Sequence, residues 1–185
     1  MKHSRNAIPS DLIMRSTTAL TSIFAAGLIL AAAAVAADPA RPDFSGRWEL
    51  DLEKSEGLPP GTKQIMTVQQ TGDRLEVELQ LSGGPAGERT LRDTYVINGE
   101  PAEFTPAMMA GDMKPKKGTR TATWAKDGSG IDVREEATLE GPEGTDTVAG
   151  ERKWRLAGGG KMLTIDIDME GKGGAMKGKR VYQKG

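Results

Sequence analysis

The feature that most constrains the fold is a two-residue alternation of apolar and polar side chains that recurs between glycine-rich turns. In residues 44–52 one face carries Phe44, Gly46, Trp48, Leu50 and Leu52, and the other carries Ser45, Arg47, Glu49 and Asp51. A period of two is that of a β-strand with one buried face, and it predicts a strand over this stretch.

The same alternation continues to the end of the chain. Asn98-Gly99 is a tight hairpin signal, and the other turns are short and rich in glycine, whereas no segment has the period of an amphipathic helix. About nine or ten short strands at even spacing indicate an all-β fold, either an antiparallel barrel or a sandwich. The predicted strands are 44–52, 63–71, 74–82, 88–97, 103–105, 119–126, 131–140, 145–156, 163–169 and 178–184.

The N-terminal segment predicts export. Residues 1–18 carry Lys2, Arg5 and Arg15, and residues 19–37 are apolar, small and end in Ala-Val-Ala-Ala. This composition is typical of a secretory signal peptide over 1–37, followed by one mature domain over 38–185 in the periplasm or outside the cell. The alternative is an uncleaved membrane anchor, because about 19 apolar residues approach the length that spans a bilayer. After cleavage we expect no stable membrane insertion.

Charge and residue usage exclude several kinds of function. Without the signal segment's three cations and Asp11, the chain's 25 basic and 26 acidic residues become 22 and 25. This near balance argues against a nucleic-acid partner, which normally requires a basic face. His3 is the single histidine and the chain has no cysteine, so the mature domain lacks histidine and cysteine nucleophiles, bases and zinc ligands. We therefore predict no enzyme activity, no metal and no cofactor.

Two strand motifs bracket the predicted domain. Gly46-x-Trp48 resembles the first-strand signature of the calycins, the lipocalins and fatty-acid-binding proteins, in which the glycine lets the chain bend and the tryptophan plugs the closed end. Arg180-x-Tyr182 resembles the strand that closes the same barrel. The resemblance implies a single antiparallel up-and-down barrel of about 8–10 strands. Residues 53–61 depart from it, because they are too few and too rich in proline for the helical lid of fatty-acid-binding proteins.

The same resemblance implies a ligand site at Arg152, Arg180 and Tyr182, which would hold a carboxylate inside the barrel. A planar guanidinium offers paired donors to a carboxylate, and Trp154 shares the face of Arg152. The alternative role for Arg180 is structural: it would stack on Trp48 and seal the barrel floor together with Gly46.

Three other clusters have both a functional and an unremarkable interpretation. The methionines could bind Cu(I), but they fit a loop or pocket lid better. The acidic residues could bind calcium, but alternating acids are typical of a solvated strand face. The basic run could touch an anionic membrane, but it is also typical of surface. These clusters are Met108, Met109 and Met113; Asp166, Asp168 and Glu170; and Lys114-Pro115-Lys116-Lys117.

The sequence thus favours an exported barrel that binds a small apolar or amphiphilic ligand, and the resemblance to fatty-acid-binding proteins implies a carboxylate on that ligand. A filled barrel that acts structurally or through its surface in the cell envelope is the main alternative. A carboxylate- and tyrosine-based isomerase or hydratase is a second one. A cavity of about 300 Å³ or more would favour ligand binding over the filled barrel. The sequence does not indicate an oligomeric state.

Overall fold

The computed structural model describes residues 41–83, 87–106, 114–142 and 144–185. The predicted signal peptide and the cluster of Met108, Met109 and Met113 lie outside these residues. The described chain contains ten strands and no helix. The strands are β1 Gly46–Leu50, β2 Lys63–Thr71, β3 Arg74–Ser82, β4 Arg89–Val96, β5 Ala102–Phe104, β6 Lys114–Trp124, β7 Gly130–Gly141, β8 Gly144–Ala157, β9 Met162–Gly171 and β10 Gly174–Lys184.

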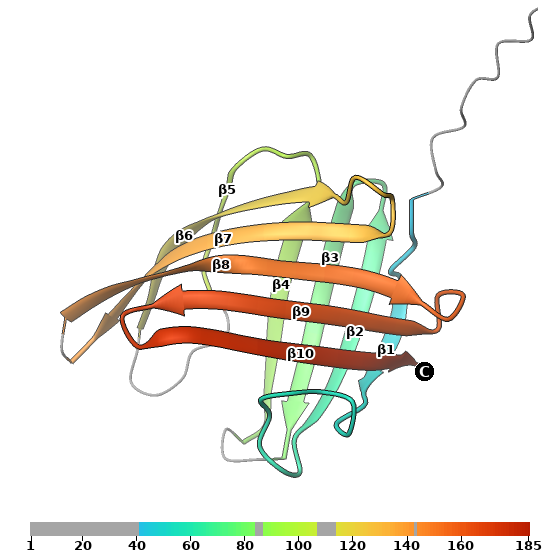
Figure 1. Ribbon diagram of the computed structural model, residues 1–185, viewed down its shortest axis with the longest axis horizontal. Coiled ribbons are helices and arrows are strands. Elements are labelled where there is room, and N and C mark those ends of the chain that lie inside the picture. The colour runs from blue at the N-terminus through green and yellow to red at the C-terminus, as the bar shows by residue number, and fades with distance from the viewer. Residues whose placement is uncertain (1–40, 84–86, 107–113, 143) are drawn as a thin grey trace, which may run out of the picture. The chain divides into compact units, whose positions relative to one another are not determined.

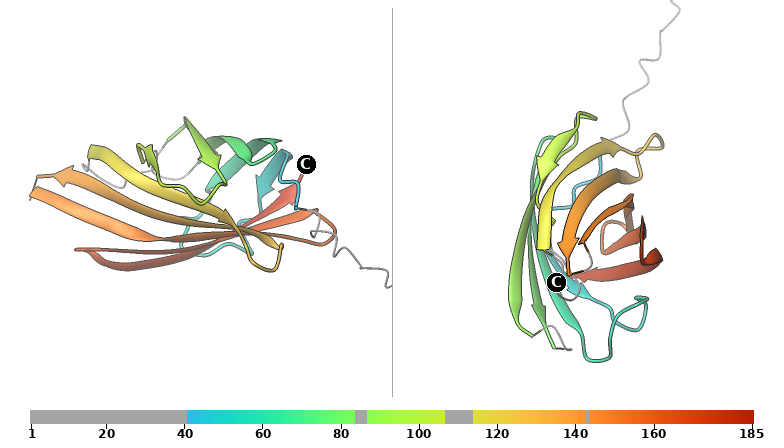
Figure 2. Two further views of the ribbon diagram at one scale, coloured as in Figure 1. Left: turned by 90° about the horizontal axis from the view of Figure 1, so that it is seen from above. Right: turned by 90° about the vertical axis from the view of Figure 1, so that its left-hand side faces the viewer.

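The strands form one antiparallel sheet in the order β4-β3-β2-β1-β10-β9-β8-β7-β6-β5. Each strand pairs with its neighbours in sequence, except that β4 and β5 are the two edges of the sheet, and the first strand pairs with the last. In Figures 1 and 2 the sheet curls so that β1–β4 form one wall and β6–β10 the opposite wall. This confirms the predicted all-β, up-and-down barrel.

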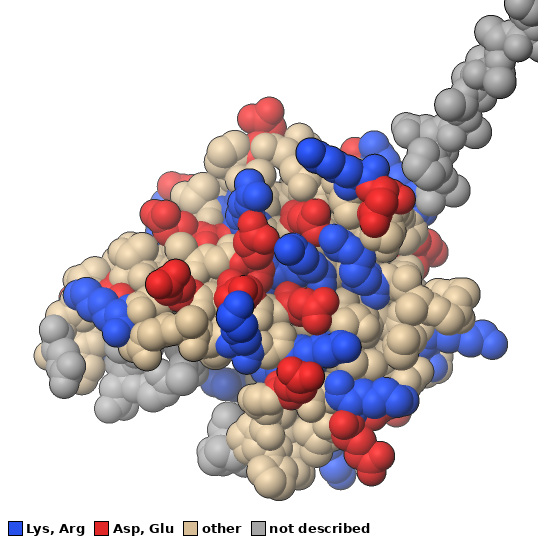
Figure 3. All heavy atoms as spheres, viewed as in Figure 1, with Lys and Arg blue, Asp and Glu red and all other residues tan. Residues whose placement is uncertain are grey.

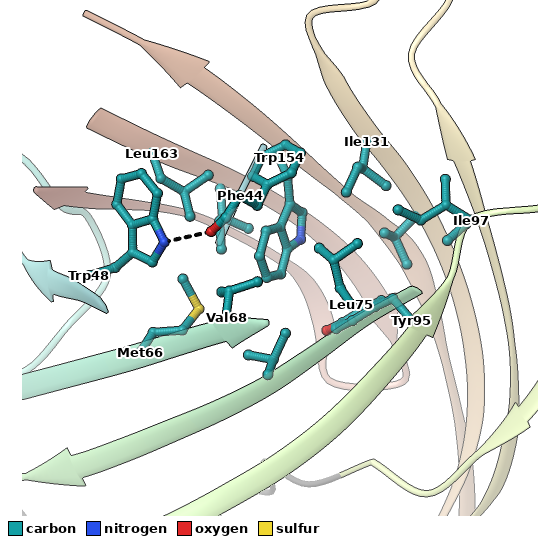
Figure 4. Close-up of a cluster of buried hydrophobic side chains, with 14 of the residues drawn as sticks. Phe44, Trp48, Met66, Val68, Leu75, Tyr95, Ile97, Ile131, Trp154 and Leu163 are labelled. Atoms are coloured by element: carbon teal, nitrogen blue, oxygen red, sulfur yellow. Dashed lines mark hydrogen bonds between the residues drawn. The ribbon is translucent and has the colours of Figure 1, made fainter. Parts of the chain in front are cut away.

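Side chains fill one end of the barrel. Phe44 and Trp48 are fully buried there, beside Leu75, Ile131 and Leu163 (Figure 4). The Trp48 indole Nε1–H donates to the Phe44 carbonyl oxygen at 2.9 Å, so its polar atom is satisfied inside an apolar cluster.

Gly46 and Lys184 complete this end. Lys184 Nζ lies 5.1 Å from the centroid of the Trp48 ring. Gly46 has a φ of +133°, and a Cβ built there would come 2.8 Å from Lys184 Cε. Glycine is therefore needed at this position both for its backbone conformation and for the room that the lysine occupies.

The cation over Trp48 is thus Lys184, and the expectation that Arg180 stacks on Trp48 is wrong. The strand register gives the reason. Trp48 lies directly opposite Lys184 in the β1–β10 pair, whereas Arg180 lies four residues farther along β10 and opposite Ile165 of β9.

The predicted alternation of buried and exposed side chains is confirmed in β9. In β9, Leu163, Ile165 and Met169 are buried, while Asp166 and Asp168 are exposed. Alternation places apolar side chains inside and charged side chains in water, as expected for a sheet with one solvated face.

Two strands, β6 and β10, begin at least four residues before their predicted starts. The predicted loop over 114–117 belongs to β6, which begins at Lys114 and has a register shift between Pro115 and Gly118. Its Lys116 pairs with Glu140 of β7 at 2.8 Å. Likewise, much of the predicted glycine-rich loop 171–178 belongs to β10, because its small residues pair along β9. In both strands, pairing with the neighbouring strand compensates for the low strand propensity of these residues.

Residues 53–61 form turns without a helix, as their length predicts. Glu56 makes an isolated antiparallel bridge to Lys179 of β10, and its N–H donates to the Lys179 carbonyl at 2.8 Å. The β1–β2 connection is therefore fastened along β10.

Candidate ligand cavity

The half of the barrel beyond the Trp48 cluster encloses a cavity of about 750 Å³. This volume lies within the range of sites for small molecules and exceeds the threshold set from the sequence. Most of the wall is apolar, and a group of charged and amide side chains lies within it. The apolar part includes Met66, Leu79, Leu91, Leu139, Val148, Ile167 and Met169, and the polar part includes Gln64, Asp93, Arg120, Glu135, Arg152 and Arg180.

All four residues predicted to bind a ligand line this cavity: Arg152, Trp154, Arg180 and Tyr182. The register explains why they meet. Trp154 lies opposite Ile165, and Ile165 lies opposite Arg180, so one row of inward side chains crosses β8, β9 and β10. Gly46 and Trp48 do not line the cavity and belong to the filled end.

Trp154 forms part of the floor between the cavity and the filled end. Its ring meets Phe44 and Tyr95 edge-on, with centroid distances of 6.1 and 5.5 Å. Its Nε1 is buried without a hydrogen-bond partner in the described part of the chain. Trp154 therefore offers the cavity apolar ring surface more than a free donor.

Arg120 is the most strongly held charge in the wall. It is 4 % exposed. Its Nη1 and Nη2 donate to the two carboxylate oxygens of Asp93 at 2.6 and 2.7 Å, and its Nε donates to Glu135 at 2.6 Å. Burial alone would lower the pKa of Arg120, but the hydrogen bonds to Asp93 and the charge of Glu135 raise it. The side chain is a fixed cation held between two acidic partners.

Two aromatic rings hold this guanidinium from its faces. The Arg120 carbon Cζ lies 4.1 Å from the ring centroid of Tyr95 and 4.1 Å from that of Phe104. Because Tyr95 belongs to β4, Phe104 to β5 and Arg120 to β6, the arginine joins the two free edges of the sheet. Nη1 also donates to the carbonyl oxygen of Thr94 in β4 at 3.2 Å.

Arg152 shares the carboxylate of Glu135. Its Nη2 lies 3.2 Å from Glu135 Oε2, while Arg120 occupies Oε1. Gly150 is the residue opposite Glu135 in β8, so no side chain stands directly beside this carboxylate on that strand. Burial would lower the pKa of Arg152, but neighbouring Tyr95 and Glu135 raise it. Its Nε is buried without a partner in the described chain.

Arg180 has a different environment. Its Nη1 donates to the backbone carbonyl oxygens of Glu56 and Lys179. It makes no ion pair with any carboxylate of residues 41–83, 87–106, 114–142 or 144–185. Burial lowers the pKa of Arg180, and the positive charge of Arg152 adds to that effect. Arg180 is therefore a half-buried cation beside the cavity with no compensating acid in the described chain.

Tyr182 is buried with its hydroxyl engaged. The O–H donates to Gln64 Oε1 at 2.6 Å, and burial raises the pKa of the phenol. Tyr95 is also buried, which raises its pKa to about 12. Both phenols stay neutral over the physiological range, and Tyr182 can offer a ligand only the lone pairs of its oxygen unless it releases Gln64.

Three charged residues of the cavity wall were not predicted from the sequence: Asp93, Arg120 and Glu135. A signal for two of them was present, because Glu135 shares a strand face with Ile131, Val133 and Ala137, and Arg120 shares one with Ala122. A charged residue within an inward apolar face indicates either a buried ion pair or a binding site.

The ten-strand up-and-down order around an internal cavity makes this a calycin-type barrel, as the sequence predicted. No family model and no curated protein matches the sequence. A solved structure that resembles the chain is that of zebrafish ileal bile acid-binding protein complexed with cholic acid. The two share 14 % identity with a TM-score of 0.47, over 77 % of this chain and 98 % of that one.

The acidic and basic clusters predicted from the sequence lie on the exposed side of their strands, and of their residues Glu170 alone also borders the cavity. Asp168 pairs with Lys177 at 2.8 Å on the outer wall, where both signs of charge alternate (Figure 3). Within the described ranges, no group of three or more acidic or histidine side chains is placed to hold a metal ion. No helix in that part of the chain is long and apolar enough to cross a bilayer.

Proposed function

We propose that the protein binds a small amphiphile with an acidic head inside the barrel. The observation that carries the proposal is the cavity of about 750 Å³, in which a mostly apolar wall contains Arg180, a cation without a carboxylate partner in the described chain. A buried charge favours an opposite charge close by, and an apolar wall favours a hydrocarbon body.

The distribution of polar and apolar residues in the cavity wall supports one orientation of the ligand. The polar group of Arg152, Arg180 and Tyr182 lies next to the Trp154 floor, and the apolar residues continue along β9 and β10 to Met176. Met176 lines the cavity and is 60 % exposed. The acidic head would therefore lie inside, near the floor, and the apolar body would extend toward Met176.

The four predicted ligand residues have unequal roles in this proposal. Arg180 supplies the net charge, and Trp154 supplies apolar surface under the head. Arg152 contributes its partnerless Nε, although Glu135 already offsets much of its charge. Tyr182 shapes the wall through its bond to Gln64.

Ion pairing favours binding over catalysis at this site. The two carboxylates deepest in the wall, Asp93 and Glu135, both accept hydrogen bonds from Arg120. A general acid or base needs a carboxyl group that can exchange its proton with the substrate. Both carboxylates are engaged by Arg120, so they contribute fixed charges to the cavity wall and do not act as proton donors or acceptors.

Displacement of a dansyl-labelled fatty acid by unlabelled acidic amphiphiles tests the proposal. Arg180→Gln should weaken binding by about tenfold, because a charge-assisted hydrogen bond contributes on that scale. Arg92→Gln is the matched control, since Arg92 is an exposed arginine on β4 that pairs with Glu78 outside the barrel. No binding by the wild-type protein, or equal affinities in all three proteins, would contradict the proposal.

We also propose that the barrel acts after export, in the periplasm or outside the cell. The basic, apolar and small-residue order of residues 1–37 supports this. N-terminal sequencing of protein from its own host should find a start near Ala37 or Asp38, and an intact, membrane-bound Met1 would contradict it.

A further inference from the structure

The wall charges of the cavity have a specific balance. Three arginines and two carboxylates lie around the polar group: Arg120, Arg152, Arg180, Asp93 and Glu135. Arg120 and Asp93 face each other through two hydrogen bonds, and Glu135 spans Arg120 and Arg152 with one oxygen each. The three arginines thus exceed the two carboxylates by one positive charge, and Arg180 is the arginine without a carboxylate partner in the described chain.

We propose that Glu135 sets the charge of the ligand head, so that the cavity accepts one negative charge and rejects two. This inference rests on the proposed function and adds the class of head group. Glu135 is a specificity-determining residue here for two reasons. Its carboxylate offsets the positive charge of Arg152, and it places a negative charge in the wall beside the ligand head.

Burial makes the effect of Glu135 strong. Its side chain is 2 % exposed, and that of Arg120 is 4 % exposed, so water does not screen the pair from a ligand in the cavity. A monoanionic head can face Arg180 and leave every charge in the wall matched. A dianionic head would add a second negative charge for which no unpaired arginine is left. That charge would also face the negative Glu135 carboxylate, and both effects are unfavourable in a poorly solvated site.

The rim does not supply the missing cation. Arg89, Asp146 and Glu170 also line the cavity, but Arg89 and Glu170 are exposed, and the acids outnumber the base. Asp146 accepts from the backbone N–H of Lys172. Solvent screens these groups, so they leave the balance near the floor unchanged.

Three ligands with a twelve-carbon chain and different heads test the inference: dodecanol, dodecanoate and dodecyl phosphate, at pH 8. The phosphate monoester is a dianion at this pH, because its second pKa is about 6. Isothermal titration calorimetry should show dodecanoate binding at least about tenfold tighter than either other ligand, since each difference involves one charge-assisted contact.

Glu135→Gln should remove this selectivity. The variant keeps the shape of the side chain and frees the charge of Arg152, so dodecyl phosphate should gain about tenfold or more in affinity and approach or pass dodecanoate. Glu136→Gln is the matched control, because Glu136 is the next residue of β7, is exposed and points away from the cavity. The control should bind all three ligands as the wild-type protein does.

The outcomes separate the two proposals. Binding of dodecanoate with no preference over dodecyl phosphate in the wild-type protein would overturn the charge selection and leave the proposed function standing. An unchanged ligand preference in a folded Glu135→Gln variant would overturn it as well. If that variant does not fold, the wild-type preference among the three heads decides. No binding of any of the three ligands would overturn both proposals.

Discussion

At the scale of single residues, the barrel keeps its polar groups neutral or paired wherever water is absent. Trp48 donates to Phe44, Tyr182 donates to Gln64, and Arg120 satisfies three of its nitrogens. A buried polar group without a partner costs free energy, so each of these contacts fixes one side-chain orientation. Among the residues that the structure describes, the two exceptions are Arg152 Nε and Trp154 Nε1, and both belong to cavity residues of β8.

The cost of ionising a buried group can be measured at Tyr95. Burial raises the pKa of Tyr95 to about 12 from 10.0. The unfolded chain therefore releases this proton at lower pH than the folded chain, and stability should fall as the pH rises from about 10 to 12, by about 2–3 kcal/mol from this group. Thermal melts of the wild-type protein and Tyr95→Phe between pH 9 and 12 measure it.

Tyr95→Phe should lose less stability over that range, because it has no phenol to ionise. Arginines remain charged throughout, and exposed lysines titrate alike in both proteins. Parallel loss of stability in the two proteins would show that Tyr95 ionises normally in the folded state.

At the scale of strands, register decides which residues meet. Gly150 lies opposite Glu135 on one side and Met169 on the other. A Cβ at this position would lie 2.1 Å from the Asp168 carbonyl oxygen and 2.7 Å from Met169 Sδ. The glycine thus permits the close approach of β8 to β9.

Gly150→Ala should therefore destabilise the protein by about 1–3 kcal/mol, as overpacking in a full interior does. Gly173→Ala is the control, since no atom lies within 4 Å of a Cβ there. Urea unfolding of the two variants should show a lower midpoint for Gly150→Ala and a midpoint near that of the wild-type protein for Gly173→Ala. Equal midpoints would mean that β8 and β9 separate at little cost.

Strand identity and facing were predictable from the sequence because they depend on alternation, which is local. Alternation placed Trp48 in the interior, and together with the family resemblance it grouped Arg152, Trp154, Arg180 and Tyr182. The Lys184–Trp48 contact was not predictable, because it depends on the β1–β10 register. The same holds for Arg120 and Asp93, which are 27 residues apart and meet only when the sheet curls.

At the scale of the whole barrel, the weak point is the seam between β4 and the paired strands β5 and β6. The described strands pair all the way around except there, where β4 and β5 are the two edges. Near one end of the seam the Gly99 N–H donates to the Ala122 carbonyl at 3.0 Å. Along the rest, Arg120 supplies the hydrogen bonds, by reaching from β6 to Asp93 and Thr94 of β4.

Arg120→Met should destabilise the barrel by about 3–5 kcal/mol, because the buried Glu135 and the partly buried Asp93 would lose their shared cation. The triple variant with Asp93→Asn and Glu135→Gln removes those charges and should recover part of the loss. The seam should stay weak in both variants, since neither restores a donor that spans it.

Hydrogen exchange followed by peptide separates a weak seam from general destabilisation. In the triple variant the amides of β4 and β6 should exchange faster than in the wild-type protein, while those of β8 and β9, which pair along their lengths, should keep their protection. Arg92→Gln serves again as the control for loss of an arginine on β4. Faster exchange spread evenly over all the strands would mean that the charge cluster stabilises the barrel as a whole and does not close a seam.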